Sequence, residues 1–369
     1  MFIRVLKMEI PIHCFLKEDD MKKIAWIILL GTAMSVGWLT PGIASADTSE
    51  IILMAHDSFS VSKAVVAEFE NRHHVRLRFL KAGDTGAMLN QAILSKNNPM
   101  ADVLFGVDNT FLSRALAADM FIPYRSPHLS DIPAELKLDA SYRLLPVDYG
   151  DVCLNYDRKW FAAKGLAPPA RLEDLTAPAY SGLTVVENPA TSSPGLAFLL
   201  ATVGHFGEDG YLNFWQKLRG GNVQVTASWK KAYWGSFSAA SKGNRPIVVS
   251  YASSPAAEVH FAEKPMEQSP TAAVVQKGTA FRQIEFVGIL RGTKKVDMAR
   301  KLVDFMLERT FQEDIPLQMF VFPANKTAVL PAVFVKHARI AEHPVFVSPQ
   351  DIAAHREEWI EAWTETVLR

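Results

Sequence analysis

Carboxylates and aromatic side chains gather in short polar segments between apolar runs. The acids are Asp57, Asp84 and Asp148, and the aromatic residues are Trp229 and Tyr251. A carboxylate balances a positive charge, and an aromatic face packs on a cation or a flat ring. The set therefore favours a ligand with a cationic aromatic part, although a cap or a turn is the commoner role of each aspartate taken singly.

The segment 188–195 carries chemistry for the opposite charge. Ser192 and Ser193 precede Pro194 and Gly195 at the expected start of a helix. Free backbone N–H groups and the helix dipole make such an end attractive to anions, and the two hydroxyls would add donors. Capping the helix is the commoner role of a residue such as Ser193, so both roles stay open. A ligand with a cationic ring and an optional phosphate tail would use both sets of residues.

Patterns for catalysis and metal binding are missing from the sequence. It has no Gly-x-Ser-x-Gly elbow, no Walker loop, no His-Glu-x-x-His and no paired-cysteine spacing. His73 and His74 are adjacent and do not share a face, so we expect them at the surface rather than on a metal. Cys153 lies in an apolar run and is expected to be a buried, inert thiol. The sequence therefore predicts no catalytic residue, no metal and no cofactor.

Strand and helix patterns alternate along the chain, which predicts α/β architecture with a parallel sheet. The expected strands are residues 51–54, 75–79, 103–106, 183–186, 223–225, 247–250 and 284–290. The expected helices are residues 61–72, 86–96, 110–118, 194–203, 211–218, 231–240 and 296–307. Ligands of such folds bind at loops that follow the carboxyl ends of strands. Four loops meet that condition, those after Met54, Phe79, Val186 and Ser250, and Trp229 adds an aromatic ring at a further loop.

The first 46 residues indicate an extension followed by a secretory signal peptide over residues 21–46. Met21-Lys22-Lys23 is a basic start, residues 24–38 form an apolar run, and Ala44-Ser45-Ala46 is a small-residue cleavage signature. The apolar run is shorter than the roughly 20 residues of a membrane-spanning helix, which disfavours an anchor. We therefore expect cleavage after Ala46 and export to the periplasm. Cleavage also removes Cys14, so no disulfide is expected within the mature chain.

Two α/β units and a late return of strand and helix predict two lobes between which the chain crosses more than once. The first lobe would comprise residues 47–148 and 281–345, and the second residues 149–280. Residues 346–369 would form a C-terminal helix packed on the body, since the segment from Ser348 to Asp351 combines an N-cap serine, a proline and an acid.

Six segments carry a resemblance to a known family. They are His56-Asp57-Ser58-Phe59 and residues 98–109, 146–150, 191–196, 229–233 and 250–256. In order and spacing they resemble the thiamine-binding proteins of bacterial thiamine ABC transporters, and the resemblance extends from Ile51 to the C-terminal helix. It implies a type II periplasmic-binding-protein fold, in which each lobe has a central sheet flanked by helices and the ligand lies in the cleft between the lobes.

The resemblance also implies the ligand, thiamine or a thiamine phosphate, and the residues that hold it. These ligand-binding residues are His56, Asp57, Asp84, Thr85, Ser192, Ser193, Trp229, Tyr251, Ala252, Ser253 and Ser254. Some positions depart from the family. His56 stands where tyrosine is expected, Thr85 where glycine is usual and Ala257 where an aromatic residue is usual. Phe320 and Phe322 stand in for tryptophan and tyrosine, so the expected cleft is less aromatic than is usual in the family.

The implied partners are an ABC permease and its ATPase, with the carrier itself a monomer. The 39 basic and 39 acidic residues cancel, so net charge gives no case for nucleic acid or a membrane surface as a partner. The same fold could instead carry a polyamine or a phosphonate. Ferric ion is disfavoured, because the adjacent tyrosine pair of such carriers is replaced by Tyr251 and Ala252. An exported thiamine-degrading enzyme is the remaining alternative, with Cys153 as its only candidate nucleophile.

Overall fold

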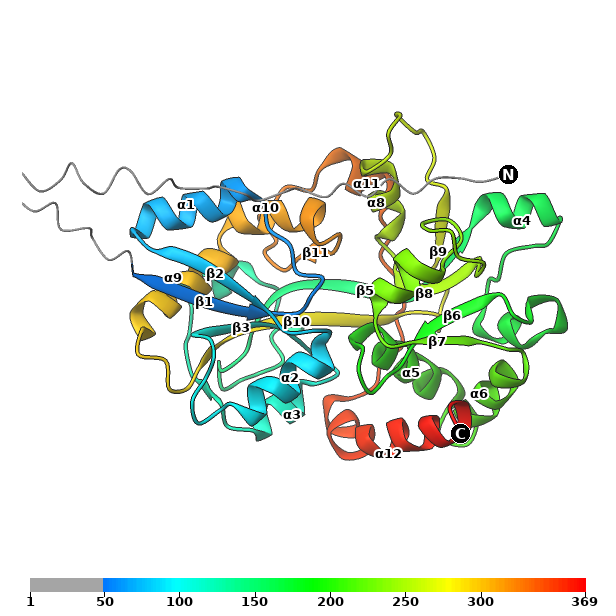
Figure 1. The fold of residues 1–369 in the computed structure, drawn as a ribbon, viewed down its shortest axis with the longest axis horizontal. Coiled ribbons are helices and arrows are strands. Elements are labelled where there is room, and N and C mark those ends of the chain that lie inside the picture. The colour runs from blue at the N-terminus through cyan, green and yellow to red at the C-terminus, as the bar shows by residue number, and fades with distance from the viewer. Residues whose placement is uncertain (1–48) are drawn as a thin grey trace, which may run out of the picture. The chain divides into compact units, whose positions relative to one another are not determined.

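The computed structural model describes residues 49–369, and the expected signal peptide and its cleavage site lie outside the described part. Within it, strands and helices alternate around one sheet (Figure 1). The strands are β1 (Glu50–Ala55), β2 (Arg76–Lys81), β3 (Val103–Asp108), β4 (Phe121–Ile122), β5 (Leu145–Asp157), β6 (Thr184–Glu187), β7 (Gln224–Thr226), β8 (Ile247–Tyr251), β9 (Thr271–Val274), β10 (Phe281–Leu290) and β11 (Phe322–Pro323). The α-helices are α1 (Lys63–His73), α2 (Thr85–Leu94), α3 (Leu112–Ala117), α4 (Arg158–Lys164), α5 (Ser193–Phe206), α6 (Tyr211–Gly220), α7 (Trp229–Lys231), α8 (Ser254–His260), α9 (Val296–Leu307), α10 (Arg309–Gln318), α11 (Ala332–His337) and α12 (Pro349–Val367).

The sheet is mixed rather than wholly parallel. Its strand order is β2-β1-β3-β10-β5-β8-β6-β7, with β4 paired to β10 and with β9 and β11 paired to β5. β1 is parallel to β2 and β3, and β6 is parallel to β7 and β8, as the alternating pattern predicts. β10 and β5 run antiparallel to their neighbours. The expectation of a parallel sheet is wrong for these two long strands, which join the two parallel sets instead of forming further strand–helix–strand units.

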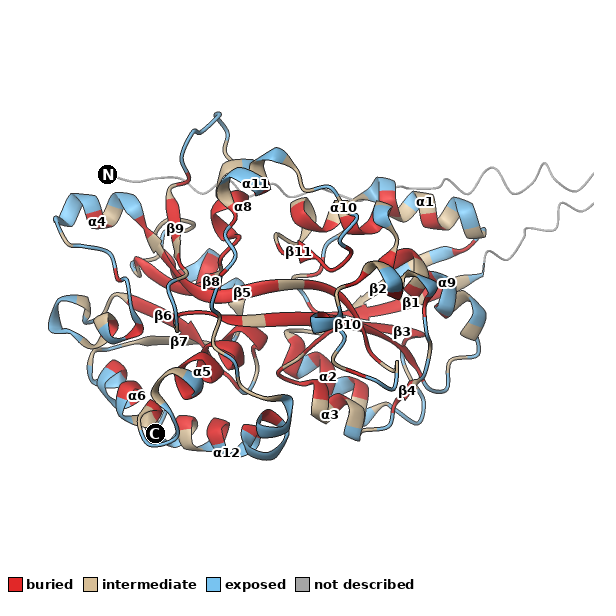
Figure 2. Ribbon diagram, turned by 180° about the vertical axis from the view of Figure 1, so that it is seen from behind, coloured by how far each residue is buried: buried red, intermediate tan, exposed pale blue. Residues whose placement is uncertain are grey.

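The strands at the centre of the sheet are buried on both faces. All six residues of β3 are buried, and only one residue of β10 is half-buried while the rest are buried. Figure 2 shows this burial running along the sheet, with exposed residues mostly on the outer helices and loops. A continuous apolar run is the pattern of a strand that helices cover on both sides. Helix α5 is buried over its first eleven residues, so its amino-terminal turn faces the interior.

The C-terminal helix α12 begins with a complete cap and is anchored by aromatic packing. The Ser348 hydroxyl accepts a hydrogen bond from the backbone N–H of Asp351 at 3.0 Å, and Pro349 is the first helical residue. Trp363 is fully buried and meets Trp215 of α6 edge to face, with ring centroids 5.5 Å apart. The helix is therefore part of the core rather than a loose appendage.

The segment before β8 departs from the helix that the sequence predicts over residues 231–240. The short helix α7 is followed by a π-helical turn, Ala232–Ser236, and then by extended chain. The backbone N–H of Ser238 donates to the carbonyl of Arg245 at 3.0 Å, which pairs this extended chain with the residues that lead into β8. The expectation of a longer helix is wrong, because backbone groups that pair with distant residues cannot also close helical turns.

Asp148 lies inside β5 and not on the loop that the sequence predicts. Its position pairs with Glu285 of β10, and its side chain is buried. Pro146 and Gly150 make the segment resemble a turn. In the structure, Gly150 instead lets the Tyr251 ring pack closely against β5. A Cβ atom at that position would come within 2.8 Å of the Tyr251 ring, so glycine lets this ring lie flat against the strand.

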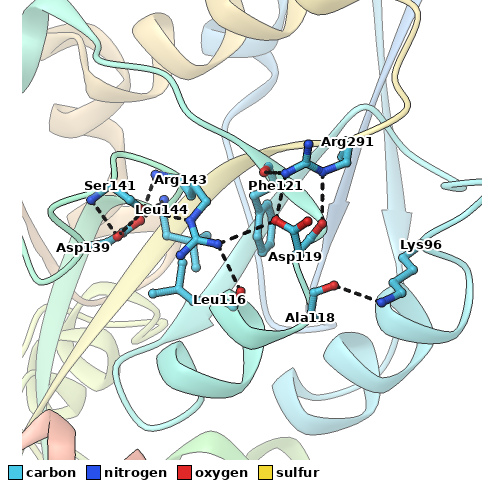
Figure 3. Close-up of polar contacts among 10 residues, drawn as sticks. All are labelled: Lys96, Leu116, Ala118, Asp119, Phe121, Asp139, Ser141, Arg143, Leu144 and Arg291. Atoms are coloured by element: carbon cyan, nitrogen blue, oxygen red, sulfur yellow. Dashed lines mark hydrogen bonds and ion pairs between the residues drawn. The ribbon is translucent and has the colours of Figure 1, made fainter.

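Polar contacts fix the loop ahead of β5 and the chain after β10 (Figure 3). Asp139 accepts backbone N–H groups from three residues, Ser141, Arg143 and Leu144, at 2.9, 2.8 and 3.0 Å. The Arg291 guanidinium, just past β10, binds the Asp119 carboxylate at 2.8 Å. At this end of the sheet, Asp139 thus holds the loop that leads into β5 by accepting its backbone N–H groups. Arg291 holds the chain after β10 by its ion pair with Asp119.

The expected lobe boundaries fall on the two long strands. The boundary at residues 148–149 lies within β5, and the one at residues 280–281 lies at the start of β10. The division into lobes at these residues stays a prediction. Among residues 49–369, the helices are too short or too polar to cross a membrane.

Candidate functional site

Segments from distant parts of the chain line one cavity of about 360 Å3, a volume typical of small-molecule sites. They are the loop after β1, the start of α2, the start of α5, the α7 turn, the end of β8 with α8, the middle of β10 and the turn after α10. The lining residues are His56, Asp57, Ser58, Phe59, Ser60, Asp84, Thr85, Ser193, Pro194, Trp229, Lys230, Tyr233, Trp234, Tyr251, Ser254, Ala257, Phe261, Gln283, Glu285, Gln318, Met319, Phe320 and Val321.

Most of the residues that the sequence points to meet at this cavity. Eight line it: His56, Asp57, Asp84, Thr85, Ser193, Trp229, Tyr251 and Ser254. Ser192, Ala252 and Ser253 are buried behind the wall instead. The Ser253 hydroxyl donates to the backbone carbonyl of Phe320, so it holds the turn after α10 rather than facing the cavity. Their assignment as ligand contacts stays a prediction.

Stacked aromatic rings and a hydroxyl chain form one wall. The Trp229 ring stacks on Tyr233 with centroids 5.1 Å apart and planes 22° apart. The Trp229 indole N–H donates to the Ser250 hydroxyl at 2.8 Å, and that hydroxyl lies 2.8 Å from the hydroxyl of Ser254. The indole is therefore held in place by β8 and α8, and Trp229 lines the cavity. An indole face can pack on a flat ring or a cation.

Tyr251 is tied to the start of α5 through a glutamine. Its hydroxyl donates to the Gln283 carbonyl oxygen at 3.2 Å, and the Gln283 amide donates to the Ser193 hydroxyl at 3.3 Å. Burial, together with nearby carboxylates, raises the pKa of Tyr251 well above its usual value. The phenol is thus a neutral hydrogen-bonding group. The contacts join β8, β10 and α5 at one point of the wall.

The start of α5 is positioned by close backbone packing. A Cβ atom on Gly195 would come within 2.7 Å of the Glu187 carbonyl oxygen, so only glycine lets the helix approach β6 this closely. This approach brings Ser193 and Pro194 to the cavity wall. Ser192 is the N-cap residue, yet its side chain makes no capping hydrogen bond. The helix start therefore faces the cavity with its dipole and the Ser193 hydroxyl.

Asp84 is the N-cap residue of α2, and its carboxyl group lies near Ser192 at the start of α5. Burial raises its pKa, while the charge of His56 and the Ser192 hydroxyl oppose that rise. Asp57, on the loop after β1, has a structural role. Its carboxylate accepts a hydrogen bond from the backbone N–H of Gly83 at 3.0 Å. Asp57 thus fixes the approach to α2, and Asp84 supplies a half-buried carboxyl group to the cavity.

His56 and Glu285 form an ion pair in the cavity wall. The His56 Nε2 atom lies 3.1 Å from the Glu285 carboxylate, and both side chains are buried. Gly106 makes room for the ring, since a Cβ atom there would clash with it. Burial opposes a charge on His56, but Glu285 outweighs burial and leaves the pKa of His56 raised. A histidine at this position therefore brings a positive charge next to the carboxylate.

Gln283 and Glu285 were not among the residues expected at the site. Both come from β10, a strand that the sequence predicts only over residues 284–290 and without a site residue. A usable signal exists, because positions 283 and 285 are two apart in a strand and point to the same face. Two polar residues on one face of an otherwise apolar strand indicate a lined cavity. Lys230, Trp234 and Phe261 were also missed, and no pattern in the sequence distinguishes them from surface residues.

Comparisons with known proteins agree with this architecture. A family model described as bacterial extracellular solute-binding protein matches residues 98–339. The thiamine-binding periplasmic protein of Salmonella typhimurium is 31% identical over 324 residues, which is 86% of this chain and 94% of that protein. The Escherichia coli protein of the same name is 31% identical over 327 residues, with the same shares covered.

Solved structures give the same result at the level of the fold. A periplasmic thiamin binding protein matches with a TM-score of 0.76 and 27% sequence identity, over 87% of this chain and 96% of that chain. A periplasmic binding protein from Actinobacillus pleuropneumoniae matches with a TM-score of 0.73 at 20% identity, over 86% of this chain and 99% of that one. The chain therefore belongs to the bacterial extracellular solute-binding protein family and has the type II periplasmic-binding-protein fold.

Proposed function

We propose that this chain binds thiamine or a thiamine phosphate and delivers it to the permease and ATPase of an ABC importer. One observation carries the proposal: a single cavity joins the Trp229 ring to the carboxyl groups of half-buried Asp84 and buried Glu285. A ring with a fixed positive charge is the ligand that matches an aromatic face beside negative charge. The printed names of the relatives, thiamine-binding periplasmic proteins, support the same ligand.

The hydroxyl or phosphate end of the ligand would lie toward α5. Ser193 and Ser254 line that side of the cavity, and Lys230 lines it from the α7 turn. The α5 dipole adds partial positive charge there. This arrangement is compatible with a free hydroxyl and with a phosphate, which is why the proposal includes both forms of the vitamin.

The proposed role is binding without chemical conversion. Cys153, the candidate nucleophile of a thiamine-degrading enzyme, is fully buried in β5 and is not among the residues that line the cavity. Burial raises the pKa of this thiol far above its usual value, which keeps it protonated and unreactive. Cys153 thus supports a carrier over an enzyme.

Location and assembly complete the proposal. The relatives are periplasmic proteins, and we infer that residues 21–46 direct this chain to the same compartment, with cleavage after Ala46. The mature protein would act as a monomer that closes on its ligand and then docks on the permease. The experiment for this part is N-terminal sequencing of the exported protein, which should begin at Asp47.

Calorimetry on purified protein freed of ligand by unfolding and refolding tests the ligand directly. We expect thiamine to bind at one site with a Kd of about 1 µM or tighter. Spermidine and a simple phosphonate serve as competitors of the other two solute classes. The absence of thiamine binding at about 100 µM, or tighter binding of either competitor, would reject the ligand.

A further inference from the structure

Three carboxylates lie side by side across three neighbouring strands at the cavity. In the register of the sheet, Glu285 of β10 pairs with Asp108 of β3 on one side and with Asp148 of β5 on the other. Residues directly opposite on adjacent strands point to the same face, with Cβ atoms about 5 Å apart. Glu285 lines the cavity, and the other two flank it within the sheet. We call Asp108, Glu285 and Asp148 the carboxylate row.

The row is buried and has few hydrogen-bond donors. Asp108, Asp148 and Glu285 are 0%, 1% and 6% exposed. Asp108 accepts the Thr110 backbone N–H and hydroxyl at 2.8 and 2.6 Å with one oxygen only. Among the residues that the structure describes, no donor reaches the other Asp108 oxygen or either oxygen of Asp148. A buried carboxylate without donors is unstable as an anion, so Asp148 and the unpaired side of Asp108 favour a bound proton.

The charges around the row do not neutralise it. His56, Tyr251 on β8 and Arg356 on α12 interact with members of the row, Arg356 through the charge of Asp108. Lys81 on β2 and Asp84 on α2 act on His56, and Glu187 on β6 lies near Asp84. His56 pairs with Glu285 alone. Lys81 binds the backbone carbonyls of residues 56 and 59 and lies outside the cavity wall. Arg356 binds Glu357 and stacks over Phe111.

Neighbouring carboxyls at this spacing cannot all be ionised. Burial, with the Glu285 charge next to it, raises the pKa of Asp148 well above its usual value. Burial likewise raises the pKa of Asp108 to about 7. Asp148 lies directly opposite Glu285 in the sheet, so negative charge on Glu285 favours the protonated form of Asp148. Asp108 and Asp148, which flank Glu285 in the row, therefore favour their protonated forms near neutral pH.

We propose that a cationic solute entering the cavity drives a proton out of the carboxylate row, so that ligand binding is coupled to proton release. The proposal rests on the proposed function, because it takes the fixed positive charge of thiamine as the trigger. A carboxylic acid of the row becomes a carboxylate, its proton passes to bulk water, and the new negative charge balances the bound cation. By linkage, affinity for the cation then rises with pH.

Calorimetry in pairs of buffers with different ionisation enthalpies measures the protons released. With purified wild-type protein and thiamine at about pH 7, we expect between about 0.3 and 1 proton released per bound thiamine. From about pH 6 to about pH 8, Kd should fall, by at most about tenfold per pH unit for one proton. Thiamine itself is the probe in this test.

Asp148→Asn locates the source of the proton. Asp148 does not line the cavity, and asparagine has nearly the same shape, so the variant removes a carboxyl from the row without removing a ligand contact. We expect it to bind thiamine but to release less than about half as many protons. The matched control is Asp297→Asn on the exposed first turn of α9, which should release as many protons as wild type.

The outcomes separate the two proposals. If wild-type protein does not bind thiamine, the proposed function fails and this inference fails with it. If thiamine binds with no proton exchange and an unchanged Kd from about pH 6 to about pH 8, the function stands and the coupling is wrong. If Asp148→Asn keeps the full release while His56→Gln abolishes it, the proton comes from the imidazolium and not from the row. The wild-type measurement decides even if Asp148→Asn does not fold.

Discussion

Trp229 shows how a single residue is prepared for binding. Its indole N–H is satisfied by Ser250, and one face is supported by the Tyr233 ring, so the side chain needs no rearrangement to offer its free face. A group held in place before binding loses little conformational entropy when the ligand arrives. The indole therefore contributes to affinity out of proportion to its contact area.

Trp229→Ala should weaken thiamine binding by about 10- to 100-fold, because it removes the ring that packs on the cation. Trp229→Phe keeps an aromatic face but loses the hydrogen bond to Ser250, so its loss should be smaller. Titration calorimetry measures both. The control is Trp160→Ala on α4, a tryptophan outside the cavity, and equal losses in the two alanine variants would contradict the role of Trp229.

Labelling of Cys153 with a thiol reagent tests whether this thiol is inert. Because the side chain is fully buried and burial raises its pKa, a thiol reagent should label the folded exported protein about 100-fold more slowly than the unfolded protein. Cys153→Ala should leave thiamine intact and its binding unchanged. Rapid labelling in the folded state, with loss of thiamine during incubation, would favour an enzyme.

The sequence revealed the residues of the site that lie in loops or at the ends of elements and missed those within β10. His56, Asp84, Trp229 and Tyr251 belong to segments whose polar and aromatic types stand out between apolar runs. Glu285 does not stand out, since its role depends on which strands lie beside β10. That neighbourhood is set by pairing with residues more than a hundred positions away, and no local pattern records it.

At the scale of elements, local signals predicted helices and strands where local forces dominate. The serine, proline and acid at residues 348–351 mark the start of α12, and the apolar spacing over residues 296–307 matches α9. The helix expected over residues 231–240 fails, because pairing between Ser238 and Arg245 takes its backbone groups. The sequence also did not indicate that β5 and β10 run antiparallel to their neighbours, since apolar runs look alike in parallel and antiparallel strands.

Trp363→Ala should lower the free energy of unfolding by about 3 to 5 kcal/mol, because it empties a fully buried site between α12 and α6. Trp363→Phe fills most of the space and should cost less than half as much. Urea unfolding gives both values. Since the side chain is remote from the cavity wall, thiamine affinity measured well below the transition should not change, and a large change would show that α12 acts on the site.

At the scale of the whole molecule, buried acids make stability depend on pH. The pKa values of Asp148 and Glu187 are raised well above the usual range and that of Asp108 to about 7, in each case mainly by burial. The same groups titrate near pH 4 in an unfolded chain. Between these values the folded protein holds more protons than the unfolded chain, so the free energy of unfolding falls as pH rises.

Ligand-free protein should therefore be more stable at about pH 5 than at about pH 8, with urea unfolding at constant salt as the measurement. Asp148→Asn should flatten the difference, because it removes one of the carboxyls that must ionise in place. Saturating thiamine should offset part of the loss at the higher pH. Stability that increases steadily over this interval would contradict the raised pKa values.

The position of β10 has a consequence for the order in which the sheet can form. This strand lies between β3 and β5 but comes from residues 281–290, long after both neighbours in the chain. The middle of the sheet cannot form until that late segment is present, and distant pairings of this kind are slow to form. A growing chain that has not yet reached residue 290 lacks the central strand β10 of its sheet. If the chain crosses the membrane unfolded, as the proposed export implies, this order postpones folding until most of the chain has passed.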